Sequence, residues 1–367
     1  MGSRDRKMIS QLCYAYFRTA LALKPVSLEE KIIAALFISS SQPSEMLQAL
    51  HPEWNRQTGL TTEEKLRLTG GEHKAPPLFF PCTNELGTGI DAERLSESCL
   101  VQPPVYLRLR PGQEIIVAQQ LQQAAVPCRQ VDEHCIAVDP GVKLETILQL
   151  NKTAVIQDYS SQQVGRMLQA IPFKEAHLQV WDCCAASGGK SILATDLLPA
   201  VQLTVSDIRD SILANLRKRF SAAGIRQYDA FETDLSVKHP HIPSRIKWEQ
   251  FDLVLADLPC TGSGTWGRNP EFLPFFQQET IGKYAALQQS ILRNIVDFIK
   301  PGGWLLYCTC SVFAAENEAN LRWLQKKFHL RIAKMEYLKG YDKAADTLFA
   351  AILQKSMTGN EKISGGQ

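Results

Sequence analysis

Short apolar segments of strand character alternate with longer segments of helical character from about residue 160 onward. Six of the short segments are expected to be strands: 178–183, 203–207, 229–233, 251–257, 304–309 and 347–353. The helix before the fifth strand is marked by apolar residues at helical spacing over 287–298, and segment 300–303 is expected to end it. This alternation predicts a doubly wound, Rossmann-like α/β domain over residues 151–356.

The chain before this domain follows a different pattern. Residues 1–75 are expected to form a helical amino-terminal region, because Ser27 and Thr61 are each followed by a glutamate three residues later, as in a capping box. At the other end of the chain, the tail 357–367 is rich in glycine and serine and is expected to be disordered.

Glycine and proline recur between residues 70 and 104, which favours a linker over regular structure. A strand over 105–110, a helix over 113–125 and a second strand over 134–138 then predict a small α+β module. We assign residues 76–150 to the linker and this module together.

Arg108 and Arg110 lie on the same side of the first predicted strand of this module, because side chains alternate along a strand. The face that they form can contact nucleic-acid phosphates or can simply be solvated, and the sequence leaves both interpretations open. The net charge is no guide, since 40 basic and 38 acidic residues leave only +2 at pH 7. Any surface that binds a nucleic acid must therefore be local.

The composition excludes several classes of protein. Hydrophobic residues make up 45% and charged residues 21% of the 367 residues, as in ordinary globular chains. No apolar stretch approaches the ~20 residues of a membrane span, and no apolar signal core follows the charged first residues. We expect a cytoplasmic protein without a membrane partner, and a monomer is the expected state.

The ten cysteines are expected to be free thiols, because a chain without a signal peptide stays in a reducing compartment. A structural zinc site would show paired Cys-x-x-Cys spacings, and none occurs: Cys183 and Cys184 are adjacent, while Cys308 and Cys310 are two apart. No metal is expected.

The first strand of the α/β domain leads into a glycine turn, 182–191, that opens a helix. At such a turn the backbone of an open α/β sheet can approach a ligand closely. Gly189-Lys190-Ser191 matches the end of a phosphate loop, but Cys184 stands where that loop requires a glycine. The G-x-G-x-x-G fingerprint of dinucleotide sites is also absent from this turn. A nucleoside ligand without a pyrophosphate fits better.

Aspartates follow the first three strands of this domain. Asp207 ends the second strand, where a carboxylate can accept hydrogen bonds from ribose hydroxyls. Asp234 follows the third strand and can reach an adenine or neighbouring polar groups. Each of these aspartates, taken alone, is more often a turn or helix cap than a ligand. Three such residues at successive strand ends, counting Asp182, favour a ligand site.

Cysteines follow the fourth and fifth strands. Cys260 lies in the segment 257–264, and Cys310 lies between Thr309 and Ser311. A single free cysteine is usually a small buried hydrophobe. Two thiols at the same edge of the sheet as the predicted ligand site favour covalent chemistry instead.

Together these motifs resemble the Sun/Fmu family (NOL1/NOP2/Sun, RsmB-like) of RNA cytosine carbon-5 methyltransferases, whose bacterial members modify 16S ribosomal RNA. The resemblance covers about residues 100–355. It rests on Gln157-Asp158-Tyr159-Ser160-Ser161-Gln162, the 184–190 turn, Asp207, Asp257-Leu258-Pro259-Cys260, Thr309-Cys310-Ser311 and Glu316-Asn317-Glu318.

The resemblance implies a methyltransferase that uses S-adenosyl-L-methionine and takes RNA as its partner, with ribosomal RNA as the expected substrate. It implies Cys310 as the nucleophile, Cys260 in release of the methylated RNA, Asp257 in contact with the target base, and Lys190 beside the cofactor and the catalytic loop. It implies Arg268 as an RNA-binding residue, which joins the candidates Arg108 and Arg110 from the strand pattern. The implied cofactor-binding residues are Cys184, Ala185, Ala186, Ser187, Gly188, Gly189, Lys190, Asp207, Asp234 and Asp257.

The chemistry explains why such an enzyme needs a thiol. Carbon 5 of cytosine is a poor nucleophile, so a thiolate first adds at carbon 6 and makes the ring enamine-like. Carbon 5 then takes the methyl group, a base removes the carbon-5 proton, and the thiol leaves. Because a free thiol has a pKa of ~8.5, neighbouring donors or positive charge are expected to favour the thiolate.

The chain departs from the family pattern at two places. Ser187 stands where a proline is usual, and the helical amino-terminal region is shorter than the NusB-like domain of many bacterial members. Three alternatives remain. Methylation at a nitrogen or oxygen needs no thiol, a DNA carbon-5 enzyme would use Cys260 as nucleophile, and a non-catalytic RNA-binding or ribosome-assembly protein would keep only the fold.

Overall fold

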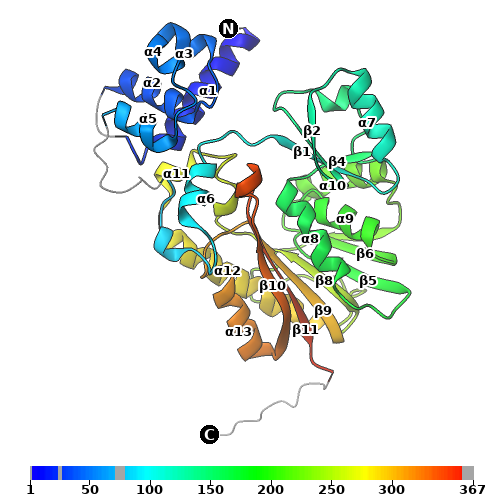
Figure 1. The fold of residues 1–367 in the computed structure, drawn as a ribbon. Helices are drawn as coiled ribbons and strands as arrows, with labels where there is room; N and C mark the ends of the chain where they lie inside the picture. The colour runs from blue at the N-terminus through cyan, green and yellow to red at the C-terminus, as the bar shows by residue number, and fades with distance from the viewer. Residues whose placement is uncertain (1, 24–26, 71–78, 358–367) are drawn as a thin grey trace, which may run out of the picture.

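The computed structural model describes residues 2–23, 27–70 and 79–357. Figure 1 shows three parts: a group of helices at the amino terminus, a small sheet with one helix, and a larger α/β domain. The predicted disordered tail, beyond Met357, lies outside the described residues. Across the described ranges, no helix has the length and apolar character needed to cross a lipid bilayer.

The amino-terminal helices are α1 (Ser3–Thr19), α2 (Leu28–Ser39), α3 (Glu45–Leu50), α4 (Pro52–Asn55) and α5 (Thr62–Leu68). Both predicted capping boxes are confirmed. The Ser27 hydroxyl accepts from the Glu30 backbone N–H, and the Glu30 carboxylate accepts from the Ser27 N–H. Thr61 and Glu64 form the same pair of bonds at the start of α5.

The segment that was expected to be a linker is partly structured. Residues 71–78 lie outside the described part, but a 3-10 turn (Thr83–Glu85) and helix α6 (Ala92–Ser98) follow them. Phe80 and Leu95 pack with Trp266 and Phe313 of the α/β domain in one buried cluster. The prediction of a plain linker was wrong here, because turn-forming residues flank a short helix whose apolar side is buried.

The small module is a four-stranded antiparallel sheet in the order β2-β3-β1-β4. Its elements are β1 (Val105–Leu109), α7 (Glu114–Gln123), β2 (Cys128–Asp132), β3 (Cys135–Val138) and β4 (Ala154–Ile156). The predicted strands β1 and β3 and helix α7 are present. Strands β2 and β4 escaped prediction, because β2 is largely exposed and without apolar alternation and β4 has only three residues.

The large sheet has seven strands in the order β10-β11-β9-β8-β5-β6-β7. They are β5 (His177–Asp182), β6 (Ala200–Asp207), β7 (Tyr228–Glu232), β8 (Phe251–Asp257), β9 (Ile299–Thr309), β10 (Leu330–Leu338) and β11 (Leu348–Lys355). All six predicted strands are present, which confirms the α/β fold class. Strand β10 was missed because it is a partly exposed edge strand whose buried residues, Leu330 and Leu338, lie only at its two ends. Segment 300–303 lies inside β9 rather than in a loop.

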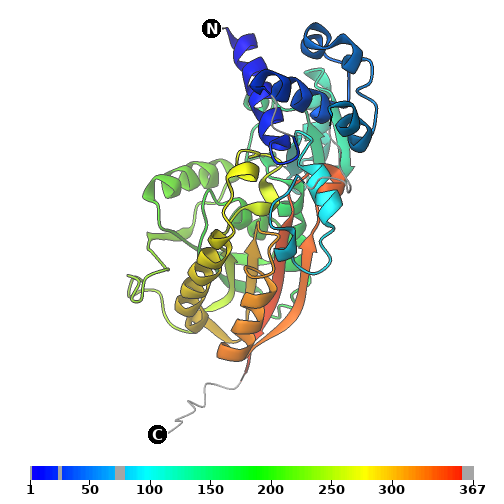
Figure 2. The ribbon, with the colours of Figure 1, turned by 90° about the vertical axis from the view of Figure 1, so that its left-hand side faces the viewer.

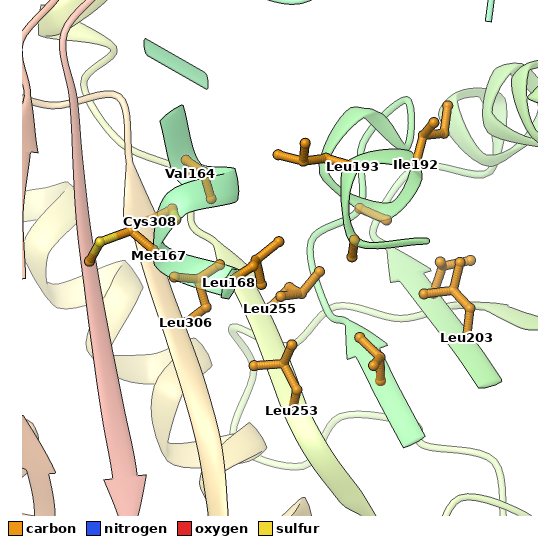
Figure 3. Close-up of a cluster of buried hydrophobic side chains, with 14 of the residues drawn as sticks. Val164, Met167, Leu168, Ile192, Leu193, Leu203, Leu253, Leu255, Leu306 and Cys308 are labelled. Carbon is orange, nitrogen blue, oxygen red and sulfur yellow. The ribbon is translucent and has the colours of Figure 1, made fainter. Parts of the chain in front are cut away.

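Helices cover both faces of this sheet. On one face are α8 (Tyr159–Gln169), α9 (Gly189–Leu197) and α10 (Asp210–Ala223), which share one apolar core with the sheet. Figure 3 shows side chains of α8 and α9 in this core with those of β6, β8 and β9. On the other face are α12 (Glu279–Ile295) and α13 (Glu318–Phe328), gold and orange in Figure 2, which contact each other.

The strand order reverses at β5. Strands β6 and β7 continue to one side of it, while β8 and β9 lie on the other, and all five of these strands are parallel. In open α/β sheets the crevice outside the carboxyl ends of the strands at such a reversal binds ligands. The segments after β5 and β8 both lie at this crevice.

The side chains of Arg108 and Arg110 are largely enclosed by the protein. Both guanidinium groups bind the carboxylate of Asp196 in α9, each with a closest N–O distance of 2.6 Å, and the Arg108 and Asp196 side chains are only 5% and 3% exposed. The strand face predicted to contact RNA or water is instead the contact between the small module and the α/β domain. The sequence could not show this, because Asp196 lies far along the chain.

Removal of Asp196 is therefore expected to destabilise the protein. The Asp196→Ala variant leaves two buried cations without their partner, which costs about 3–5 kcal/mol of unfolding free energy in comparable cases. Denaturant unfolding of the variant and the unmodified chain measures this loss. The matched control is Asp210→Ala, which breaks an exposed pair with Arg217 and should cost only ~0–1 kcal/mol. Equal losses in the two variants would contradict the assignment.

Candidate active site

The turn between β5 and α9 has a backbone that requires glycine. Gly188 has φ 80°, and a Cβ there would lie 2.5 Å from a ring carbon of Phe220. Ala186 also has a positive φ, 46°. The backbone N–H of Ala185 donates to the Ser206 carbonyl at 2.9 Å, so the turn is fixed to the end of β6. The sequence Cys184–Lys190 thus forms a tight bend whose conformation a larger residue at 188 would prevent.

Asp207 supports this turn from the end of β6. Its buried carboxylate accepts from the Ala186 N–H at 3.0 Å and, through the other oxygen, from the Arg209 N–H at 3.1 Å. Asp234 instead accepts from the N–H and hydroxyl of Ser236, at 2.8 and 2.6 Å, as the turn interpretation expects. The structure therefore brings Asp207 to the glycine turn and gives Asp234 a local turn. Contact of either with a cofactor remains a prediction.

Other groups at the turn fit a nucleoside ligand with hydrogen-bond donors. Asp182 is buried, and its Oδ1 has no hydrogen-bond partner among the described residues, while Oδ2 accepts from the Ser191 hydroxyl at 2.6 Å. Burial raises the pKa of Asp182 to about 7. A Cβ on Gly189 would meet no atom within 4 Å, so the start of α9 faces open space. Acceptors beside open backbone suit ribose hydroxyls and an ammonium group.

Arg219 of α10 was missed by the sequence analysis. Its Nη1 donates to the Ser187 hydroxyl at 2.6 Å and to the Ser187 carbonyl at 3.0 Å. Its Nε donates to the side-chain oxygen of Asn151 at 2.9 Å. The serine that replaces the usual proline therefore gives the turn an additional hydrogen bond. No local sequence pattern around Arg219 predicts this contact.

Lys190 and Asp257 form an ion pair between the turn and the end of β8. Lys190 Nζ lies 2.6 Å from Asp257 Oδ2. Burial disfavours the charge on Lys190, but Asp257 and the nearby thiols of Cys308 and Cys310 together raise its pKa above the ordinary value. Lys190 is thus a cation within the electrostatic reach of Cys310. The Asp257 side chain is 33% exposed, so it can also contact a ligand.

The structure places Cys260 and Cys310 against each other. Their Sγ atoms are 3.1 Å apart and both side chains are half-buried. The hydrogen bond with Cys310, burial and the charge of Glu316 hold the pKa of Cys260 well above its ordinary value. Lys190 lies within electrostatic reach of Cys310, whereas Cys260 carries the raised pKa, so the surroundings of the two thiols differ.

The backbone around the thiols is tightly hydrogen-bonded. The Gly264 N–H donates to the Cys310 carbonyl at 2.8 Å, and the Gly264 carbonyl accepts from the Thr347 N–H at 2.8 Å. A Cβ on Gly264 would lie 1.8 Å from the Thr347 carbonyl oxygen, so only glycine fits. This contact fixes the loop of Cys260 to that of Cys310.

Arg268 does not present a free guanidinium to a substrate. It donates to Asp346 at 2.9 Å and to the Pro104 carbonyl at 3.1 Å, and it forms a third bond with Asp158. The RNA-binding role implied by the resemblance is not supported by this arrangement, because two carboxylates already neutralise the charge. Arg268 instead joins the Cys260 loop to the start of α8 and to the segment before β11.

All ten cysteines are free thiols. Within the described ranges, His, Cys, Asp and Glu side chains form no group of three or more that could hold a metal ion.

Comparison with known proteins places this site in a family. Residues 167–347 match the family model described as 16S rRNA methyltransferase RsmB/F. Ribosomal RNA small subunit methyltransferase B from Xylella fastidiosa is 32% identical over 244 residues, which cover 64% of this chain and 53% of that protein. The Shewanella oneidensis protein of the same name is 28% identical over 86% of this chain and 80% of its own. The chain thus spans about half the length of the first of these relatives.

Two solved structures share the fold. PH0851 has a TM-score of 0.68 at 19% identity and covers 97% of this chain and 91% of its own. A methyltransferase homologue from Pyrococcus horikoshii has a TM-score of 0.60 at 22% identity and covers 74% of this chain and 92% of its own. The similarity to PH0851 extends over the helical region and the small module as well as the α/β domain.

Asp207→Ala is expected to weaken binding of S-adenosylmethionine, since it removes the predicted acceptor for the ribose and releases the Ala186 N–H that fixes the glycine turn. We expect a loss of about tenfold or more in affinity, equal to the ~1.4 kcal/mol of one charge-assisted hydrogen bond. Isothermal calorimetry measures this. Asp210→Ala, which alters an exposed carboxylate three residues later, is the control. Unchanged affinity in a folded Asp207→Ala variant would remove Asp207 from the cofactor site.

Proposed function

Because the chain belongs to the RsmB/F family of RNA cytosine methyltransferases, we propose that it methylates carbon 5 of cytosine in RNA with S-adenosyl-L-methionine. The observation that carries this proposal is the 3.1 Å approach of the Cys260 and Cys310 thiols. Both lie at the carboxyl edge of the sheet, beside the Lys190–Asp257 pair. Methylation at a nitrogen or oxygen would need neither thiol.

Cys310 is the proposed nucleophile. Its sulfur, within electrostatic reach of the Lys190 ammonium, adds as the thiolate to carbon 6 of the cytosine ring and forms a carbon–sulfur bond. The electron pair displaced from the double bond makes carbon 5 nucleophilic, so that carbon 5 takes the methyl group. After the carbon-5 proton is removed, the double bond re-forms and the bond between Cys310 and carbon 6 breaks.

Cys260 and Asp257 have the supporting roles in this proposal. Cys260, kept as a neutral thiol 3.1 Å from Cys310, is placed to give its proton to the Cys310 sulfur as that sulfur leaves carbon 6, while water takes the carbon-5 proton. Asp257 keeps one carboxylate oxygen on Lys190 and is exposed enough to hold the target base with the other. The same residue thereby connects the position of the base to the cation beside Cys310.

The glycine turn is the proposed binding site of the cofactor, which supplies the methyl group as a sulfonium when bound. The backbone of residues 184–190 and the carboxylate of Asp207 would hold its nucleoside and amino-acid parts. Asp182 Oδ1 is a buried acceptor available to a donor on this ligand. Asp234, although it forms a local turn, stays in the proposed set because it follows β7 at the same edge of the sheet.

The proposed substrate is 16S ribosomal RNA, acted on in the cytoplasm. The bacterial relatives carry the name ribosomal RNA small subunit methyltransferase B, and the matching family model carries a 16S description. The test is bisulfite sequencing of 16S ribosomal RNA from cells with and without the gene. We expect one protected cytosine to become convertible in the deletion strain and to be protected again on complementation. Identical conversion patterns would contradict the 16S assignment.

Substitution of the two cysteines is expected to have opposite effects on the covalent cycle. Cys310→Ala should abolish both methyl transfer and any protein–RNA adduct, because no bond to carbon 6 can form. Cys260→Ala should still attack and methylate but release product slowly, so that a covalent complex accumulates. Denaturing electrophoresis with labelled RNA detects that complex.

The control is Cys128→Ala, which removes an exposed thiol on β2 and should behave as the unmodified chain. An adduct in Cys310→Ala, together with none in Cys260→Ala, would make Cys260 the nucleophile, as in DNA carbon-5 enzymes.

A further inference from the structure

Glu316 is a fully buried carboxylate in the segment between β9 and α13. Four hydrogen bonds reach it. Oε2 accepts from the Thr261 N–H at 2.9 Å and from the Gln288 side chain at 3.1 Å. Oε1 accepts from the hydroxyls of Thr261 at 2.6 Å and Ser311 at 2.5 Å. A carboxylate has about four lone-pair positions, so these four donors fill its capacity to accept hydrogen bonds.

Two of the donor residues adjoin the thiols. Thr261 directly follows Cys260, and Ser311 directly follows Cys310. Glu316 therefore connects the two cysteine-bearing loops, one from the end of β8 and one from the end of β9, through the residue next to each sulfur. The β-sheet pairing ends before these loops, at Asp257 opposite Cys308. Beyond that point, side-chain hydrogen bonds supplement the Gly264 contact in setting the separation of the thiols.

Residues around Glu316 hold it in one orientation. The Gln288 side-chain N–H₂ donates to Glu316 and also to the carbonyl of Pro259, the residue before Cys260, at 3.0 Å. The Gln288 carbonyl oxygen in turn accepts from Asn320 at 2.7 Å, which fixes which end of the amide faces Glu316. The Tyr307 hydroxyl donates to the Glu316 backbone carbonyl. Both the side chain and the backbone of Glu316 are thus restrained.

The contacts of the next two residues, Asn317 and Glu318, show which of the three residues links the two cysteine loops. Asn317 accepts from Thr309 at 2.6 Å and donates to the Ser311 carbonyl at 2.8 Å. Of the two cysteine loops, it therefore contacts only that of Cys310. Glu318 accepts from the Thr88 N–H and from the Tyr337 hydroxyl, both at 2.9 Å, and contacts neither cysteine loop. Of the three, only Glu316 joins both loops.

We propose that Glu316 is a positioning residue that sets the distance between Cys260 and Cys310 by joining the residues that follow them. Its significance for catalysis rests on the proposed function, since attack by one thiol and elimination assisted by the other require both at the same base. The distance itself is a property of the folded chain. It can be measured without RNA and without methyl transfer.

The test uses diamide, which takes up the two thiol hydrogens as Cys260 and Cys310 close to a disulfide. The sulfur atoms must move from 3.1 Å to ~2.05 Å, so closure depends on how well they are placed. Loss of the Glu316 charge removes one cause of the raised pKa of Cys260 and by itself would speed closure, so slower closure reports displaced sulfurs. Glu316→Gln keeps the size of the side chain but replaces one acceptor oxygen with an N–H₂ group. That group then faces the N–H and hydroxyl donors that bind the carboxylate in the unmodified chain. We expect closure to slow about tenfold or more and kcat for RNA methylation to fall about 100-fold, with the KM for RNA unchanged.

The matched control is Glu318→Gln, the same substitution two residues away, which should close its disulfide at the unmodified rate. Thr261→Val removes one of the bonds to Glu316 with little change in size and should slow closure by a smaller factor, which keeps the test available if Glu316→Gln does not fold. Mass spectrometry of digested protein identifies the Cys260–Cys310 disulfide. Closure at the unmodified rate in folded Glu316→Gln or in Thr261→Val would overturn the proposal.

The disulfide-closure test and the methylation test can fail independently of each other. If the unmodified chain transfers no methyl group to RNA, the proposed function is wrong, yet the closure rates still decide the role of Glu316. If methylation occurs but the closure rates of the Glu316 and Glu318 variants agree, the positioning role is wrong and the function stands.

Discussion

The parallel pairing of β8 with β9 is the interaction on which the site depends. Its register places Asp257 opposite Cys308, and the Leu258 N–H continues the ladder to the Cys308 carbonyl at 2.9 Å. Both strands then end at neighbouring positions on the same edge of the sheet. As a result, two cysteines that are 50 residues apart in the sequence meet at 3.1 Å. A shift of this register would separate the thiols and would also move Asp257 away from Lys190.

The charged groups around Cys260 and Cys310 differ, although the two side chains are chemically identical. Lys190 extends from the glycine turn, and Asp257, Cys308 and Cys310 raise its pKa against the effect of burial. Glu316, in the segment that contains Cys310, contributes to the raised pKa of Cys260. In the proposed function, the thiol near the cation attacks and the thiol near the carboxylate stays protonated, which would divide addition and elimination between the two cysteines.

The sequence predicted the parts of this site that are local. Strand ends, the glycine turn and the positions of Cys260 and Cys310 follow from short patterns, because parallel strands bring their carboxyl ends to one edge. The partners of the arginines could not be predicted. Arg108, Arg110 and Arg268 bind Asp196, Asp158 and Asp346, and these pairs form only when separate parts of the chain pack together. The motif at Glu316 was visible, but its role depends on Thr261, 55 residues earlier.

The most direct measurement of the central claim is identification of the residue that bonds to the base. Fluorine at carbon 5 prevents the final proton removal, so an RNA made with 5-fluorocytidine should remain attached to the protein after methyl transfer. Peptide mass spectrometry of the complex formed with 16S ribosomal RNA and S-adenosylmethionine locates the bond. The account predicts a cytosine joined through carbon 6 to Sγ of Cys310. Attachment at Cys260, or recovery of free protein with no complex, would contradict it.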